Sequence, residues 1–342
     1  MPNVGTINMT GGTIEGNWAG IHAKMGTIDI SGGTVRATGE KYIVDINGGF
    51  GVGGVNGGTS KDGSAIVLHS DMYTANPSDE NDYTAETSTD LTLRVSGAAV
   101  LESENWNAIS YYKWNKNEQN VSLDGGNYDV VGVISYNGTC DGNDADAVSQ
   151  IREFLANGDI DKVYYHGNSL PVLSEGETAY DLAGKTLETD QTYSTTVGTG
   201  ASLILSNGTL IGNAIEKSNL NFLCAENGGT IQADKITLYT MGSAFYAKGQ
   251  DATVKVTGSL IDANGYCVST NAGSADNHGV IIELLGSEFI SNRSAGTAII
   301  LNVPGKLTME ECTVDSQLQS VIVRGGTATL TRCTLTNVVP DE

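Results

Sequence analysis

The sequence predicts an all-β chain that winds into a right-handed parallel β-helix, and two repeated features carry this prediction. Short segments of alternating apolar residues recur along the chain, as where Ile7 and Met9 reappear 21 residues later as Ile28 and Ile30. Alternation with period two is typical of a strand that buries one face. Small residues, Gly above all, follow most of these segments and permit a sharp bend. Strands and bends that repeat at this period are typical of a solenoid.

The repeat can be written as a template in which two apolar residues flank one residue and a third apolar residue follows after four more. Successive matches lie mostly 21 to 28 residues apart, and loops absorb the longer intervals. The matches in chain order are Ile7/Met9/Ile14, Ile28/Ile30/Val35, Ile66/Leu68/Tyr73, Leu93/Val95/Val100, Val121/Leu123/Tyr128, Leu203/Leu205/Leu210, Ile231/Ala233/Leu238, Val254/Val256/Ile261, Ile282/Leu284/Phe289, Leu307/Met309/Val314 and Ala328/Leu330/Leu335.

Two neighbouring columns describe the bend after each first strand. The first is mostly Gly or Asn, which tolerate a left-handed backbone, and so predicts one bend stacked on itself. It consists of Gly11, Gly32, Gly97, Gly125, Asn207, Gly258 and Gly286, with Ser70, Lys235, Glu311 and Arg332 as exceptions. The next column predicts a tight corner with small side chains: Gly12, Gly33, Ala98, Gly126, Gly208, Ser259, Ser287, Cys312 and Cys333, with Asp71 and Ile236 as exceptions.

A third strand follows the corner in most coils and completes the helix. Its apolar segments are AGIHA, NAISYY, VGVISY, NFLCA, SAFYA, YCVST, TAIIL and SVIVR. Strands of neighbouring coils pair at about 4.8 Å. The right hand of the helix follows from the usual chirality of parallel crossovers.

The five cysteines include no C-x-x-C spacing that would indicate a metal site. Cys312 and Cys333 share a column 21 residues apart, so we expect them on adjacent rungs. We expect free thiols that fill the corner as small apolar side chains. A disulfide or a metal pair is the alternative.

The repeat breaks between Cys140 and Gly158, where apolar residues at 148, 151, 154 and 155 have helical spacing. We expect a short helix near residues 144–157, capped by Asp144 or Asp146 and ended by Gly158. The end of a β-helix exposes strand edges and core, which such a helix can cover. We therefore expect a first β-helix segment of about five coils at 1–140 and a helix-capped second segment with six template coils at 141–342. One continuous solenoid with a helical insertion is the alternative.

Bulk properties narrow the partners and the location. The net charge of −22 disfavours nucleic acids and anionic membranes as partners. The sequence contains no apolar stretch of about 18 residues, so no transmembrane helix is expected. The chain starts within a coil pattern and without a signal sequence, which favours a fragment of a larger protein. The acids at 79–82 and in DGNDAD fit solvated loops and a helix cap better than calcium sites, so neither metal nor cofactor is expected.

The segments "DLAGKTLE…GASLILSNGTLIGN" and "GTINMTGGTIEGN" resemble the repeat-rich, pectate-lyase-like β-helix proteins of Firmicutes cell surfaces. The resemblance covers most of the chain and depends on the repeat consensus. It implies a bacterial, extracellular protein at the cell surface with an adhesin-like role. It transfers no catalytic residue to this chain.

Catalysis is the first alternative, because polysaccharide lyases and glycoside hydrolases also use this fold. The outward positions between the first two apolar residues place no acids on adjacent rungs. Lys255 and Glu283 are neighbours there, but opposite charges in a ladder are expected to pair with each other. The four histidines share no spacing. The sequence therefore predicts no catalytic residues and leaves enzymatic activity the less favoured interpretation.

Aromatic residues are the stronger functional signal. Trp18 stands three residues before Ile21, and Trp106 three before Ile109, so the two tryptophans are expected to share a column. Rings presented by a rigid sheet stack on sugars or anchor partners. The predicted site comprises Trp18, Trp106, Tyr111, Tyr112, Trp114 and Tyr136, of which Tyr111 and Tyr136 are aligned two residues after Ile109 and Ile134.

These residues predict a non-enzymatic adhesin that binds carbohydrate or another ligand on a host or microbial surface. The first alternative is that the rings point into the core and serve the fold. In that case the chain is a passive stalk or spacer that holds another module away from the cell.

Overall fold

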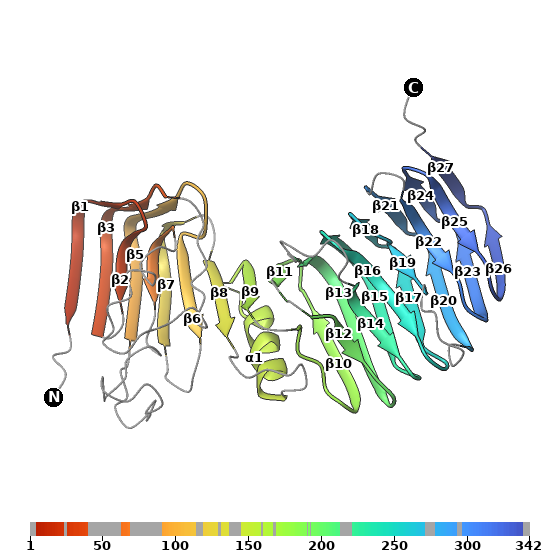
Figure 1. Cartoon of the computed structure of the whole chain (residues 1–342). Helices are drawn as coiled ribbons and strands as arrows, with labels where there is room; N and C mark the ends of the chain where they lie inside the picture. Colours follow the sequence, from red (N-terminus) through yellow and green to blue (C-terminus); the bar gives the residue numbers. More distant parts are fainter. Residues whose placement is uncertain are drawn as a thin grey trace. The chain divides into compact units, whose positions relative to one another are not determined.

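The computed structural model describes residues 5–23, 26–39, 63–68, 91–113, 119–128, 131–136, 145–158, 160–166, 169–189, 191, 193–212, 221–270, 278–292 and 296–337. Parallel strands dominate this part of the chain, which also contains one helix, α1 (Ala145–Ala156) (Figure 1). The predicted all-β fold, a parallel β-helix, and the predicted short helix near residues 144–157 are both confirmed.

Contacts divide the chain into two units. The first unit comprises Met1–Gly138 and Asn157–Tyr164, and the second comprises Thr139–Ala156 and Tyr165–Glu342. Helix α1 therefore belongs to the second unit. Strand β9 (Lys162–His166) follows the helix and begins in the first unit.

The first unit consists of two ladders of parallel strands. One is a four-stranded sheet, formed in this order by β1 (Thr6–Gly16), β3 (Gly26–Ala37), β5 (Leu91–Ser103) and β7 (Gln119–Tyr128). The other ladder joins β2 (Ala19–Ala23), β4 (Ser64–Leu68), β6 (Ile109–Lys113) and β8 (Val131–Tyr136). A long bent strand and a short strand thus make up each coil of this unit.

The template match at Ile66/Leu68/Tyr73 is wrong. Ile66 pairs with Ile21 on one side and Ile109 on the other, so β4 is a third strand of its coil and not a first strand. Leu93 pairs directly with Ile28 instead. After Ser64, the residues of β4 are an unbroken apolar run, and the strand is buried on both faces. Such a run contains every period-two pattern and cannot reveal which strand of the coil it forms.

A register shift also corrects the third template position of the next coil. Leu101, and not Val100, lies opposite Val35, because the ladder shifts between Ile30 and Gly32. Leu101 is buried and Val100 is only half-buried. One extra residue in the bend therefore moves the inward position by one, as a β-bulge does.

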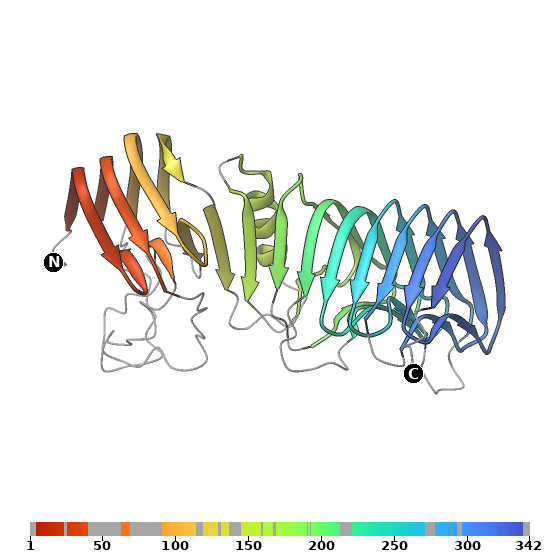
Figure 2. The same cartoon turned by 90° about the horizontal axis from the view of Figure 1, so that it is seen from above.

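In the second unit, each coil contributes three parallel strand segments, here called legs, and each leg pairs with the corresponding leg of the next coil (Figure 2). The first and second legs are β10 (Gly176–Asp181), β11 (Thr186–Thr189), β13 (Ala201–Gly212), β15 (Thr230–Thr240), β17 (Thr253–Thr257), β18 (Leu260–Ala263), β20 (Val280–Leu285), β21 (Glu288–Ser291), β23 (Gly305–Glu310), β24 (Thr313–Ser316), β26 (Thr327–Thr331) and β27 (Thr334–Asn337). The third legs form a six-stranded sheet of β12 (Thr195–Val197), β14 (Asn221–Glu226), β16 (Ser243–Lys248), β19 (Val268–Ser269), β22 (Thr297–Leu301) and β25 (Gln319–Val323).

The six template coils of this unit pair in the predicted register. Leu205 pairs with Ala233, and the same column continues through Val256, Leu284, Met309 and Leu330. The inward residues of this column are buried from Leu205 to Met309, whereas Leu330 is 40% exposed.

The template missed one coil. Strand β10 pairs Thr178 with Leu203 and Tyr180 with Leu205, and β11 pairs Leu187 with Leu210. This coil has a Thr at the first position of the template and a longer bend before Leu187. A search for the apolar template therefore does not find it.

The predicted stacked bend is present in the second unit. Its residues, which we call the bend column, have φ angles between 52° and 56° at Asn207, Lys235, Gly258, Gly286, Glu311 and Arg332. The three charged residues that depart from the Gly or Asn pattern therefore adopt the same left-handed conformation. In the first two coils of the chain the prediction is off by one residue, because the positive φ occurs at Gly12 and Gly33 and not at Gly11 and Gly32.

Hydrogen bonds explain the small residues in the corner column. Ser259 and Ser287 donate their hydroxyls to the carbonyls two residues earlier, over 2.7 and 2.8 Å. The thiols of Cys312 and Cys333 make the same contact at 3.3 and 3.4 Å. Thr334 N donates to Cys312 O, which places these cysteines on adjacent rungs as predicted. The four cysteines within the described ranges are free thiols, and Cys140 lies outside those ranges.

Helix α1 packs against the first strand of the second unit. Val148, Ile151 and Leu155 are buried, and Phe154 is half-buried. Arg152 donates to the carbonyls of β10, from Nε to Ala179 O over 2.8 Å and from a terminal nitrogen to Glu177 O over 3.5 Å. The helix thereby covers groups that an open strand edge would expose.

The structure tests only one of the two predicted helix caps. Asp144 and the side chain of Asp146 lie outside the described residues. Gly158 follows the helix without the left-handed backbone expected of a C-terminal cap.

Candidate functional site

The two tryptophans that the structure describes lie at one corner of the first unit, before the third strand of their coils. Ile21, Ile66 and Ile109 form one column, so Trp18 and Trp106 share the column three residues earlier, as predicted. Gly63 occupies the rung between them, and its N–H donates to Trp18 O over 2.6 Å. The tryptophans are therefore two rungs apart, about 9.6 Å, and do not stack on adjacent rungs.

Their environments differ. Trp18 is 42% exposed. Trp106 is half-buried and meets Tyr164 edge to face, with ring centroids 6.2 Å apart and an interplanar angle of 79°. Lys162 Nζ lies 4.7 Å from the centroid of the Trp106 ring, within range of a cation–π contact. Packing therefore accounts for much of the Trp106 surface, whereas Trp18 exposes a larger fraction of its surface to solvent.

The remaining predicted rings belong to the ladder of β6 and β8 or follow it. The side chains of Tyr111, Tyr112 and Tyr136 and the whole of Trp114 lie outside the described residues. The backbone register still corrects one expectation, because Ile109 pairs with Val131 and not with Ile134.

Tyr111 therefore lies opposite Val133, and Tyr112 lies opposite Ile134. Tyr111 and Tyr136 do not share a column. The segment VGVISY has apolar residues that fit either register, so the pattern alone could not decide between them.

Three glutamates near this corner surround one arginine. Arg36 lies between Glu15 and Glu102 on neighbouring strands, at 3.9 and 3.5 Å, and binds Glu104 at 2.5 Å. All four side chains are at least a third exposed. Such exposed ion pairs contribute modestly to stability.

Further observations on the described residues concern an ion pair on the second unit, metal ligands and membrane spans. Lys255 Nζ and Glu283 Oε2 are 2.9 Å apart, which agrees with the expectation that they pair. No group of three or more His, Cys, Asp or Glu side chains able to hold a metal ion occurs among the described residues. No helix within these ranges has the length and apolar character needed to cross a membrane.

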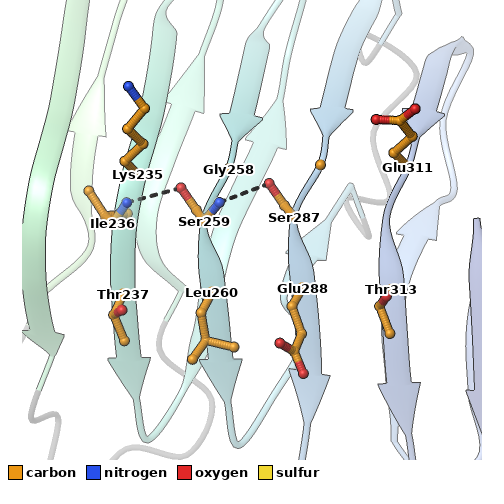
Figure 3. Close-up of a pocket in the computed structure, with 11 residues that line it drawn as sticks. Lys235, Ile236, Thr237, Gly258, Ser259, Leu260, Ser287, Glu288, Glu311 and Thr313 are labelled. Carbon is orange, nitrogen blue, oxygen red and sulfur yellow. Dashed lines mark hydrogen bonds between the residues drawn. The ribbon is translucent and has the colours of Figure 1, made fainter.

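A second candidate site is a shallow groove of about 420 Å³ at a corner of the second unit, which we call the corner groove. It lies across the left-handed bends of β15, β17–β18, β20–β21 and β23–β24 (Figure 3). Figure 3 shows Lys235 and Glu311 projecting from two rungs of the bend column, with Gly258 between them. Glu288 and Thr313 line the opposite side of the bend.

Hydrogen bonds hold the floor of the corner groove. Ile236 N donates to Ser259 Oγ, and Ser259 N donates to Ser287 Oγ, both over 3.1 Å (Figure 3). Both serine hydroxyls also donate to carbonyls of their own coils, so the floor is a satisfied and rigid network. The exposed groups at the rim are the ammonium of Lys235 and the carboxylates of Glu288 and Glu311.

Sequence reasoning missed the corner groove because it took glycines in the bend column only as conformational residues. The available signal was two successive glycines, at 258 and 286, between charged residues of the same column. Comparisons of the chain with protein-family models, with curated proteins and with solved structures gave no match.

Proposed function

We propose that this chain is a non-enzymatic, adhesin-like β-helix that binds glycans at a bacterial cell surface. The observation that carries the proposal is the exposed ring of Trp18 at a bend whose backbone is held by the neighbouring rung. An indole exposed to this extent can stack on a sugar face.

The expected affinity per site is low. Aromatic contacts contribute about 0.5–1.5 kcal/mol each beyond buried area. One or a few rings therefore support dissociation constants on the order of millimolar to tens of micromolar. Multivalent display would multiply this affinity, as surface adhesion requires. The resemblance to pectate-lyase-like surface proteins of Firmicutes supports the extracellular part of the proposal.

A passive stalk is the second candidate, and the packing of Trp106 favours it. Trp106 contacts Tyr164 and Lys162, so one predicted ligand contact also serves the fold. A polysaccharide lyase or hydrolase has less support, because Lys255 and Glu283 form an ion pair with each other.

The test is a glycan array probed with multivalently displayed wild-type protein and Trp18→Ala. We expect about a tenfold loss of signal for Trp18→Ala with an unchanged melting temperature. Leu318→Ala is the matched control, because Leu318 is an exposed apolar residue of the second unit, with 50% exposure. Equal binding by wild type and Trp18→Ala would refute the role of Trp18, and no binding to any glycan would favour the stalk.

A further inference from the structure

The bend column of the second unit contains a gap. The left-handed conformation recurs at six rungs, and four of them carry the long or polar side chains Asn207, Lys235, Glu311 and Arg332. Only Gly258 and Gly286 leave the column without a side chain. The bend geometry therefore accepts Lys, Glu and Arg, so the two glycines do more than permit a turn. They leave open a stretch that side chains would otherwise fill.

The space above these glycines is accessible. A Cβ on Gly286 would meet no atom within 4 Å, and a Cβ on Gly258 would meet only Lys235 Cγ, at 3.6 Å. The Lys235 stem thus forms one wall of the opening, and its ammonium reaches solvent. Both glycines line the corner groove.

The rim offers both hydrogen-bond donors and hydrogen-bond acceptors. Lys235 donates, Glu288 accepts, and the hydroxyls of Thr237 and Thr313 can do either. Leu260 supplies a small apolar surface between the threonines, since it pairs with Thr237 and Glu288 on the adjacent rungs. Three of the four rungs carry a polar rim group, and successive rungs are about 4.8 Å apart, which is close to the length that one sugar unit adds to an extended glycan.

An exposed ring lies beside this rim. Tyr239 follows Thr237 by two residues on the same outward face of β15, pairs with Asp262 and is 42% exposed. Alternation in a strand places Thr237 and Tyr239 on one face. A glycan that runs across the rungs of the corner groove can therefore reach a stacking surface as well as hydrogen-bonding groups.

The charges favour an uncharged ligand. Lys235 and Glu288 oppose each other in sign, and Arg332 binds Glu311 at 2.8 Å and Glu310 at 2.6 Å. A polyanion would meet Glu288 and a chain of net charge −22. A polycation would gain from that net charge but would meet Lys235 inside the groove. Hydroxyl groups can satisfy the carboxylates and the ammonium together.

We propose that the corner groove is a second carbohydrate site, which binds an uncharged, extended glycan segment lying along the helix axis over the rungs of Lys235, Gly258, Gly286 and Glu311. The ligand class rests on the proposed function, whereas the residues are separate from Trp18 and belong to the other unit. The two sites together make the chain bivalent for glycans, which raises its avidity.

The decisive variant is Gly286→Arg in the full chain. Lys235 and Arg332 already occupy the same left-handed bend on other rungs, so the variant is expected to fold and to fill the groove. The matched control is Asn207→Arg, which adds the same charge to the same column outside the groove lining. Glu288→Ala provides a second test on an exposed strand position, should Gly286→Arg fail to fold.

The measurement is binding of the monomeric protein to soluble neutral oligosaccharides, to polygalacturonate and to polylysine, by NMR titration and on an array. We expect Gly286→Arg and Glu288→Ala to lower affinity for a neutral oligosaccharide about tenfold, with Asn207→Arg unchanged. Binding restricted to polygalacturonate or polylysine would overturn the proposed ligand class.

The outcomes separate this proposal from the proposed function. If Trp18→Ala loses glycan binding while Gly286→Arg and Glu288→Ala keep it, the groove proposal is overturned and the glycan-binding function stands. If the groove variants lose binding and Trp18→Ala keeps it, the groove is supported and the role of Trp18 is refuted. If wild type binds no glycan at all, both proposals are refuted.

Discussion

Truncating Leu284 to Ala should destabilise the protein far more than truncating Leu330, although both leucines occupy the same inward column. Leu284 is 2% exposed and lies between Val256 and Met309 on the adjacent rungs. Leu330 pairs with Met309 on one side and is 40% exposed. The two sites thus share residue type, strand position and backbone, and differ in burial.

The magnitudes follow from that difference. Leu284→Ala removes buried methyl groups and leaves a closed cavity, which costs about 2–5 kcal/mol. Leu330→Ala removes less buried surface and opens to solvent, so about 1 kcal/mol is expected. Leu284→Asp should exceed Leu284→Ala, because an unpaired carboxylate would enter the core.

Urea unfolding followed by far-UV circular dichroism measures how much each substitution lowers the free energy of unfolding. A solenoid can unfold in steps, so hydrogen exchange in β20 and β26 should locate each effect on its own coil. Equal losses at Leu284 and Leu330, or a loss below about 1 kcal/mol at Leu284, would refute the reasoning that the inward column is graded by burial.

Two further predictions concern thiols and surface charges. Burial raises the pKa of Cys224 from 9.0 to about 12, so its folded form holds a proton that the unfolded chain releases, and stability should fall as the pH rises from about 9 to 12. Cys224→Ala should flatten this part of a stability–pH profile, and an unchanged slope would contradict the assignment. A double-mutant cycle on Lys255→Ala and Glu283→Ala should give a coupling of about 0.2–1 kcal/mol that shrinks with added salt. A larger coupling energy that does not change with salt concentration would indicate a role beyond surface pairing.

Sequence periodicity located most of the coils because each first strand buries one face. In the second unit, the pairing of Leu203 with Ile231 and of Ile282 with Leu307 matches the template residue by residue. In the first unit the same reasoning assigned Ile66 to a first strand instead of a third strand. The reason is that β4 is buried on both faces, so apolar and polar residues do not alternate along it.

The candidate sites were less accessible to sequence reasoning. The shared column of Trp18 and Trp106 could be predicted from their spacing to the isoleucines that follow. That Trp106 packs on Tyr164 could not, because the contact joins residues 58 positions apart in sequence. The corner groove needs four coils in register, and no local pattern encodes it.

In the second unit, the sequence by itself determined the strand faces, the position of the helix and the stacked bend, because these depend on period, apolar character and backbone preference within a few residues. Tertiary structure alone decided which rung lies beside which, as where an extra residue in the bend turned Leu101 inward in place of Val100. It also decided which exposed side chains share a surface, such as Lys235, Glu288 and Glu311. Pairing between coils sets these positions, and its register depends on the length of every bend and loop in between.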